Sequence, residues 1–182
     1  IGSFDNFTIV LNTGPTSAVV VDISSSDTGE VTVSPASLSF STGNWSIAQT
    51  VIVTGINDNV SDGDQNSNII VGVDNSTSDP NYAALSDINV GVTTLDDDDA
   101  GFSLGSTAGL SVNESGTTDT FTVVLDTEPT ADVVFAITSE NTAEAIVSSS
   151  LTFTSANWNT PQSVTITGVD DPLDDNDQTV SI

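Results

Sequence analysis

The chain carries two copies of one sequence pattern. The segment Phe7–Leu11 (FTIVL) recurs as Phe121–Leu125 (FTVVL) at an offset of 114 residues, and Gln49–Gly55 (QTVIVTG) recurs as Gln162–Gly168 (QSVTITG) at an offset of 113. One residue has therefore been lost between the two blocks. A repeat of this length indicates two structural units built on the same plan.

Each copy is expected to be all-β. Short runs rich in Val, Ile, Thr and Phe are bounded by Gly, Pro, Asn, Asp and Ser, which is typical of strands separated by turns. No window shows a helical period. About seven short strands in each unit fit an antiparallel, immunoglobulin-like sandwich of the Calx-beta-like kind discussed below. In the first copy, strands are expected at 7–12, 18–23, 49–54, 68–73 and 87–94.

The register of the repeat predicts two incomplete copies, residues 1–100 and 101–182. Leu110–Glu114, at the start of the second copy, has no counterpart before Ile1, and residues 70–99 have none after Ile182. The first copy is thus expected to lack its opening strand and the second its closing strands. Either the sequence is a window of a longer repetitive chain, or neighbouring subunits complete the open edges by strand exchange.

The charge balance excludes several classes of partner. The chain has no Lys, Arg, His or Cys, and 26 Asp and Glu residues give it a net charge of −26. Nucleic acid and anionic membrane surfaces both need a basic patch, so neither is expected to bind, and no apolar run is long enough to span a bilayer. Because neither His nor Lys is present to activate a nucleophile, we expect no enzymatic activity.

Many of the acidic residues lie in three short clusters. Without a protein cation, such carboxylates must be satisfied by main-chain donors, water or a bound ion. Calcium takes six to eight oxygen ligands and tolerates irregular loops, whereas zinc would need His or Cys. Solvated acidic loops are the alternative interpretation. The clusters are Asp58, Asp62 and Asp64; Asp96, Asp97, Asp98 and Asp99; and Asp170, Asp171, Asp174, Asp175 and Asp177.

The motif Val112-Asn113-Glu114-Ser115-Gly116, followed by Thr120–Leu125, resembles the opening of a Calx-beta domain. This resemblance implies structural Ca²⁺ at one end of each sandwich. The chain departs from the family in the second acidic run, which usually contains Glu but has only Asp and Asn here. Asn57-Asp58-Asn59 more weakly resembles the calcium linker of cadherins. Besides the three clusters, the ligands implied are Glu114, then Asp27 or Glu30 in the first copy, and Glu140 or Glu144 in the second.

Together these features predict a structural, calcium-binding repeat of an extracellular adhesin or surface fibre. The absence of Lys and Arg removes every trypsin-type cleavage site, which suits a secreted protein. The expected partners are neighbouring repeats of the same or adjacent chains, including a homopolymer. Two alternatives stay open: a subunit of an extracellular filament or sheath assembled by strand exchange, and a glycan- or protein-recognition module of an adhesin.

Overall fold

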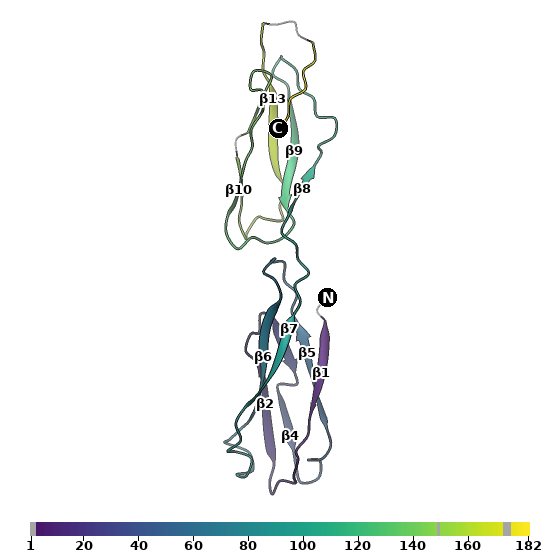
Figure 1. Ribbon diagram of the computed structural model, residues 1–182, viewed down its shortest axis with the longest axis vertical. Coiled ribbons are helices and arrows are strands. Elements are labelled where there is room, and N and C mark those ends of the chain that lie inside the picture. Colours follow the sequence, from purple (N-terminus) through teal and green to yellow (C-terminus); the bar gives the residue numbers. More distant parts are fainter. Residues whose placement is uncertain (1–2, 149, 173–175) are drawn as a thin grey trace. The chain divides into compact units, whose positions relative to one another are not determined.

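The computed structural model describes residues 3–148, 150–172 and 176–182, and the regular elements in these ranges are antiparallel β-strands. The chain divides into two compact units (Figure 1). Unit 1 comprises Ile1–Asp58 and Asp62–Asp96, and unit 2 comprises Asn59–Ser61 and Asp97–Ile182. The all-β expectation is confirmed. No helix among the described residues is long and apolar enough to cross a membrane.

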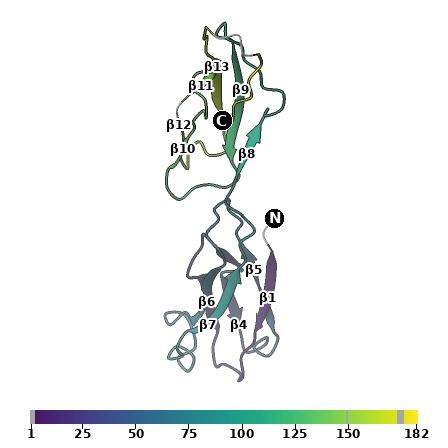
Figure 2. The ribbon, with the colours of Figure 1, turned by 45° about the horizontal axis from the view of Figure 1, so that its top comes forward.

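Unit 1 is a sandwich of two antiparallel sheets. One sheet has the strand order β1-β5-β3, and the other has the order β4-β2-β6-β7 (Figures 1 and 2). About seven strands were expected and five positions were named; β3 and β4, the two not named, alternate but have only four residues each. The strand expected at 7–12 begins and ends three residues earlier. The bounds are β1 Phe4–Ile9, β2 Val19–Ser25, β3 Val31–Ser34, β4 Ser37–Phe40, β5 Gln49–Gly55, β6 Gln65–Val73 and β7 Ile88–Thr94.

Alternation along the strands produces the core of unit 1. In β2, Val19, Val21 and Ile23 are buried, while Asp22 between them is exposed. Side chains of both sheets meet in one apolar cluster, and full burial of such a side chain contributes about 1.5–3 kcal/mol. The buried members are Val19, Val21, Ile23, Val31, Leu38, Phe40, Val51, Val53 and Ile69.

Unit 2 has one four-stranded sheet and one two-stranded sheet. The first has the order β11-β13-β9-β8, and the second pairs β10 with β12. Phe135 of β10 contacts Phe102 and Phe153 edge-to-face, with ring centroids 5.1 Å and 5.9 Å away. The bounds are β8 Phe102–Gly105, β9 Thr118–Leu125, β10 Val133–Ala136, β11 Ala145–Val147, β12 Ser150–Phe153 and β13 Gln162–Gly168.

The two copies share hydrogen bonds at matched positions as well as sequence. The Gln49 side chain donates to the Ser39 carbonyl at 2.9 Å, and Gln162 donates to the Thr152 carbonyl at 2.8 Å. Strands β9 to β13 thus correspond to β1 to β5. In the described part of unit 2, no strand corresponds to β6 or β7. The boundary near residue 100 and the incompleteness of the two copies stay predictions.

Candidate functional site

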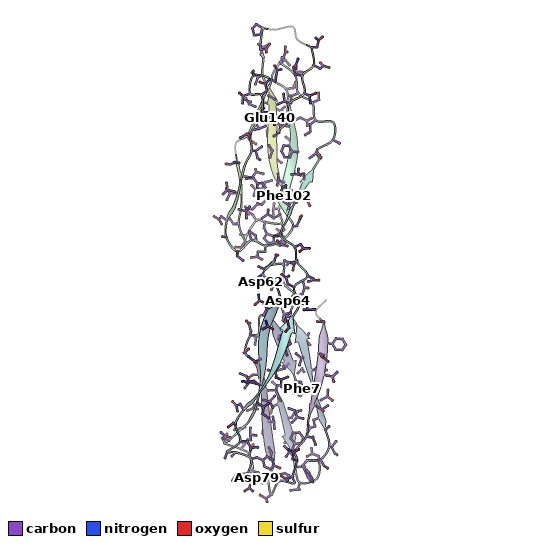
Figure 3. All side chains as sticks on the ribbon, viewed as in Figure 1. Phe7, Asp62, Asp64, Asp79, Phe102 and Glu140 are labelled. Carbon is purple, nitrogen blue, oxygen red and sulfur yellow. The ribbon has the colours of Figure 1, made fainter. Side chains whose placement is uncertain are left out.

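Three loops bring acidic residues to one end of unit 1. The β2–β3 loop carries Asp27 and Glu30, the β5–β6 loop carries Asp58, Asp62 and Asp64, and Asp96 follows β7. Asp62 and Asp64 lie together at this end, and Asp79 lies at the opposite end of the unit (Figure 3). Antiparallel pairing of β6 with β7 places Gln65 opposite Thr94, so the residues flanking both strands meet here. We call this set of residues the acidic end.

Glu30 is affected by the other carboxylates of the acidic end. The pKa of Glu30 is raised, first by the partial burial of its carboxyl and then by the negative charges of Asp58, Asp62, Asp27 and Asp96. Like charges disfavour the ionised form, and no Lys, Arg or His exists to offset them. Four sequence-predicted ligands therefore lie within electrostatic range of Glu30, which was itself one of two alternatives in its loop.

Main-chain donors satisfy part of this charge. The Gly63 N–H donates to Asp96 Oδ2 at 2.7 Å, and the Asp96 N–H donates to Asp64 Oδ1 at 3.1 Å. Gly63 has a φ of +78°, a left-handed conformation that strongly favours glycine. This reciprocal pair of bonds fastens the β5–β6 loop to the segment after β7, and both partners come from predicted acidic clusters.

The residue types of the acidic end fit calcium, because all of its charged donors are carboxylate oxygens. Their arrangement is not a formed coordination shell. In the ranges that the structure describes, no group of three or more Asp or Glu side chains is placed so that it could hold a metal ion. Ion binding would require these side chains to turn toward a common centre.

In unit 2, the structure distinguishes between the two glutamates that the sequence left open. The Glu144 carbonyl accepts from the Val169 N–H at 2.9 Å, as the Glu30 carbonyl accepts from the Ile56 N–H at 2.7 Å. Glu144 is therefore the counterpart of Glu30. The loop position of Asp27 is taken by Asn141, whose side chain accepts from the Ala143 N–H at 3.1 Å.

A cavity of about 1210 Å³ gathers some of the unit 2 acids. Glu114, Glu144 and Asp177 line it, together with apolar side chains of the four-stranded sheet. Asp170 and Asp171 follow β13. Two further predicted ligands, Asp174 and Asp175, lie outside the described residues. Of the run after β7, Asp96 belongs to unit 1, whereas Asp97, Asp98 and Asp99 belong to unit 2.

Sequence reasoning missed one buried carboxylate, Asp79. Its Oδ2 accepts from the Thr16 hydroxyl at 2.7 Å and from the Ser17 N–H at 3.0 Å, and its Oδ1 accepts from the Asn81 N–H at 2.9 Å. The Thr16 hydroxyl is the main cause that holds the pKa of Asp79 well below its ordinary range. Its side chain is fully buried. A lone Asp in a polar loop carries no signal that separates it from solvated acids.

Comparisons with known proteins add little. No family model matches the chain, and no curated protein matches it. SSP-19, an MSP-domain protein like family member in Caenorhabditis elegans, is 16% identical over 52% of this chain and 86% of its own, with a TM-score of 0.33. The structure of CBD12 from CALX1.2 is 15% identical over 91% of this chain and 69% of its own, with a TM-score of 0.35. Similarity at this level carries no functional argument.

Proposed function

We propose that this chain is a structural, calcium-binding repeat module of an extracellular adhesin or surface fibre, without enzymatic activity. The observation that supports this function is the acidic end of unit 1. There, the negative charges of Asp27, Asp58, Asp62 and Asp96 raise the pKa of Glu30, in a chain without a single basic side chain. A divalent cation would relieve that repulsion and link three loops.

Calcium is the ion that suits these donors best. It accepts six to eight oxygen ligands at 2.3–2.6 Å in variable geometry, whereas magnesium demands a strict octahedron. Neighbouring repeats are the natural partners of such a module, because repeats stack on one another in fibres. Secretion is part of the proposal, since millimolar calcium is the regime of extracellular modules.

Thermal unfolding tests calcium binding directly. The protein is melted in chelator and in increasing calcium at constant ionic strength, with magnesium in a parallel series. A ligand at 100 times its Kd stabilises the folded state by about 2.7 kcal/mol, so the unfolding temperature of unit 1 should rise with calcium. Superimposable melting curves in chelator and in millimolar calcium would contradict the proposal.

A pair of double variants separates binding from simple charge screening. Asp62→Asn with Asp64→Asn removes two carboxylates from the acidic end and should abolish most of the calcium response. Asp22→Asn with Asp87→Asn removes the same charge from exposed positions elsewhere in unit 1 and should leave the response intact. Equal responses of the two double variants would show that calcium acts on net charge alone.

A further inference from the structure

Strand β4 forms one edge of its sheet in unit 1, and β12 holds the matching place in unit 2. In the described residues, β4 pairs only with β2, and β12 pairs only with β10. The two strands have nearly the same sequence, Ser-Leu-Ser-Phe in β4 and Ser-Leu-Thr-Phe in β12. Sheet edges are templates for pairing with a further strand, and charged residues or proline commonly protect them. Neither strand contains such a residue.

The pairing of β2 shows which main-chain groups of β4 point to the free side of the sheet. The Val20 N–H donates to Ser78 Oγ, and the Val20 carbonyl accepts from the N–H of Asp74, which follows β6, both at 2.9 Å. Both groups of Val20 thus point away from β4, where Ser39 lies opposite. Opposed residues in an antiparallel pair exchange either both hydrogen bonds or neither. The N–H and carbonyl of Ser39 therefore point to the free side.

The side chain of Asn44 occupies this free side. Its Nδ2 donates to the Ser39 carbonyl at 3.3 Å, and its Oδ1 accepts from the Ser41 N–H at 2.5 Å. Gln49 adds a second donor, because its Nε2 donates to the same Ser39 carbonyl at 2.9 Å. A carbonyl oxygen has two lone pairs, so both acceptor sites of Ser39 are in use. A strand added at this edge would need the same main-chain groups.

The same arrangement closes the edge of β12 in unit 2. Asn157 Nδ2 donates to the Thr152 carbonyl at 3.3 Å, and Asn157 Oδ1 accepts from the Thr154 N–H at 2.6 Å. Gln162 Nε2 donates to the Thr152 carbonyl at 2.8 Å. The edge residues differ between the copies, Ser in one and Thr in the other, whereas the Asn and the Gln are identical at an offset of 113 residues.

Formation of the β4–β5 turn does not require all of these bonds. Main-chain groups already hold the turn, since the N–H groups of Asn44 and Trp45 both donate to the Ser41 carbonyl, at 3.3 and 3.1 Å. Gln49 lies beyond the turn, as the first residue of β5 in the other sheet, and still directs its amide to the edge of β4. The two amides thus bind groups that pairing with a further strand would use.

We propose that Asn44 with Gln49, and Asn157 with Gln162, close the edges of β4 and β12 against strand pairing with further copies of this chain. A second copy is the partner excluded, because its own β4 and β12 present the same alternation to pair with. An incoming strand must first displace the side-chain amides. Net charge gives little protection here, because neither strand is charged and the Debye length is only about 8 Å at physiological ionic strength.

Removal of the two Asn amides tests the proposal on the full chain. Asn44→Ala with Asn157→Ala should associate at least about tenfold more strongly than wild type, the factor that one to two hydrogen bonds supply. Sedimentation velocity in chelator measures association in about 1 M salt, where a Debye length of about 3 Å removes long-range repulsion. Wild type should stay monomeric. A monomeric variant, or equal association of wild type, would overturn the proposal.

A rescue variant separates opening of the edge from loosening of the turn. Ser39→Pro with Thr152→Pro removes the N–H that points to the free side, a change that edge strands tolerate. Added to the two Ala substitutions, it leaves the lost turn bonds unrepaired and should still restore the monomer. Trp45 and Trp158 fluorescence reports whether both units stay folded. Continued association of this folded variant would assign the effect to the turn and overturn the proposal.

Substitution of the two Gln residues gives a milder test that stands independently of the Asn variant. Gln49→Ala with Gln162→Ala keeps the turn and frees one acceptor site in each edge, so association should fall between wild type and the Asn variant. Asn68→Ala with Asn159→Ala is the matched control, because it removes one exposed amide from each unit elsewhere. This control should stay monomeric, and association equal to that of the Gln variant would contradict a role for the edges.

Amide hydrogen exchange locates the contact in the variants that associate. Exchange should slow with protein concentration in fragments covering residues 37–41 and 150–154, because strand pairing protects the main-chain N–H groups at these edges. Fragments covering β6 should keep their rate, since β6 lies between β2 and β7 in its sheet. Concentration-dependent slowing that spares both edges would overturn the proposal.

Discussion

The Gly63 N–H and Asp96 Oδ2 form a 2.7 Å hydrogen bond that joins the β5–β6 loop to the segment after β7. Asp96 belongs to the acidic end, where its charge and those of three other Asp residues raise the pKa of Glu30. In this bond a main-chain N–H, rather than a basic side chain, donates to the carboxylate. Main-chain amides hold Asp96 and Asp64 in place.

Substitution of Asp96 should separate the hydrogen bond from the charge. Asp96→Asn keeps an acceptor for the Gly63 N–H and removes one negative charge, so unit 1 should be at least as stable as wild type in chelator. Asp96→Ala removes both and should be less stable than the Asn variant by about 0.5–1.5 kcal/mol. Urea unfolding at pH 7 measures the difference, and equal stability of the two variants would contradict a structural role for this bond.

The raised pKa of Glu30 predicts that the stability of unit 1 falls as the pH rises, the opposite of the effect of a carboxylate whose pKa is lowered by folding. The folded state binds this proton more tightly than the unfolded state does, so the stabilisation is present below the ordinary Glu pKa. It is lost as the pH rises through the raised pKa in the folded state. In chelator, Glu30→Gln should remove this decline from the unfolding free energy of unit 1. Glu128→Gln is the control, and a profile for Glu30→Gln that follows wild type would rule out the effect.

The tandem β-sandwich plan could be predicted because the two copies confirm each other. A strand such as β5 and its match β13 share the pattern of alternate buried Val and Ile, and that pattern is local in the sequence. The strands β3 and β4 were not named from the sequence, because each has only four residues, the shortest run in which alternation indicates a strand. Their positions depend on pairing with β5 and β2, which are distant in the sequence.

The acidic end could be predicted in outline only. Its members follow strand ends, so the sequence shows that they lie in loops, and the resemblance suggested that the loops meet. The sequence left open Glu140 or Glu144 as a ligand. The offset of 114 residues and the hydrogen bond from the Val169 N–H to the Glu144 carbonyl make Glu144 the counterpart of Glu30, and the choice of ligand stays a prediction. Asp79 was missed for a related reason: its burial is created by partners more than 60 residues away.

Asp79 and Asp74 should determine how the stability of unit 1 decreases as the pH is lowered. The Ser76 hydroxyl is the main cause that lowers the pKa of Asp74 to about 2, and hydrogen bonds hold the pKa of Asp79 lower still. Groups with depressed pKa values stabilise the fold above their ordinary pKa of about 3.9, and that stabilisation disappears as the pH falls through the folded value. Asp79→Asn should therefore destabilise unit 1 at pH 7 and approach wild type toward pH 2.

A matched substitution shows whether this effect belongs to the site. Asp22→Asn removes an exposed carboxylate from the same unit, and its stability should differ little from wild type at every pH. Unfolding temperatures followed by circular dichroism between about pH 7 and 2 give the comparison. If the difference in unfolding temperature between Asp79→Asn and wild type stays constant across that range, the lowered pKa of Asp79 is not what stabilises unit 1.

Unit 2 should unfold before unit 1. The buried cluster of unit 1 joins side chains from both of its sheets, whereas Val133 and Phe135 of unit 2 are half-buried. Less apolar area removed from water means less stabilisation. The two tryptophans report each unit separately, because Trp45 lies in unit 1 and Trp158 in unit 2. In single-tryptophan variants, Trp45→Phe and Trp158→Phe, the Trp158 signal should change at the lower urea concentration.

The same two tryptophan signals measure how much a buried phenylalanine stabilises each unit. Phe40 and Phe153 occupy matched positions, and both are fully buried. Phe40→Ala should cost about 3–5 kcal/mol and shift only the Trp45 signal. Phe153→Ala should cost a similar amount, which exhausts the smaller stability of unit 2 and leaves Trp158 in an unfolded environment without denaturant, while Trp45 keeps its native transition. A native Trp158 spectrum in Phe153→Ala would mean that unit 2 is far more stable than its half-covered core indicates.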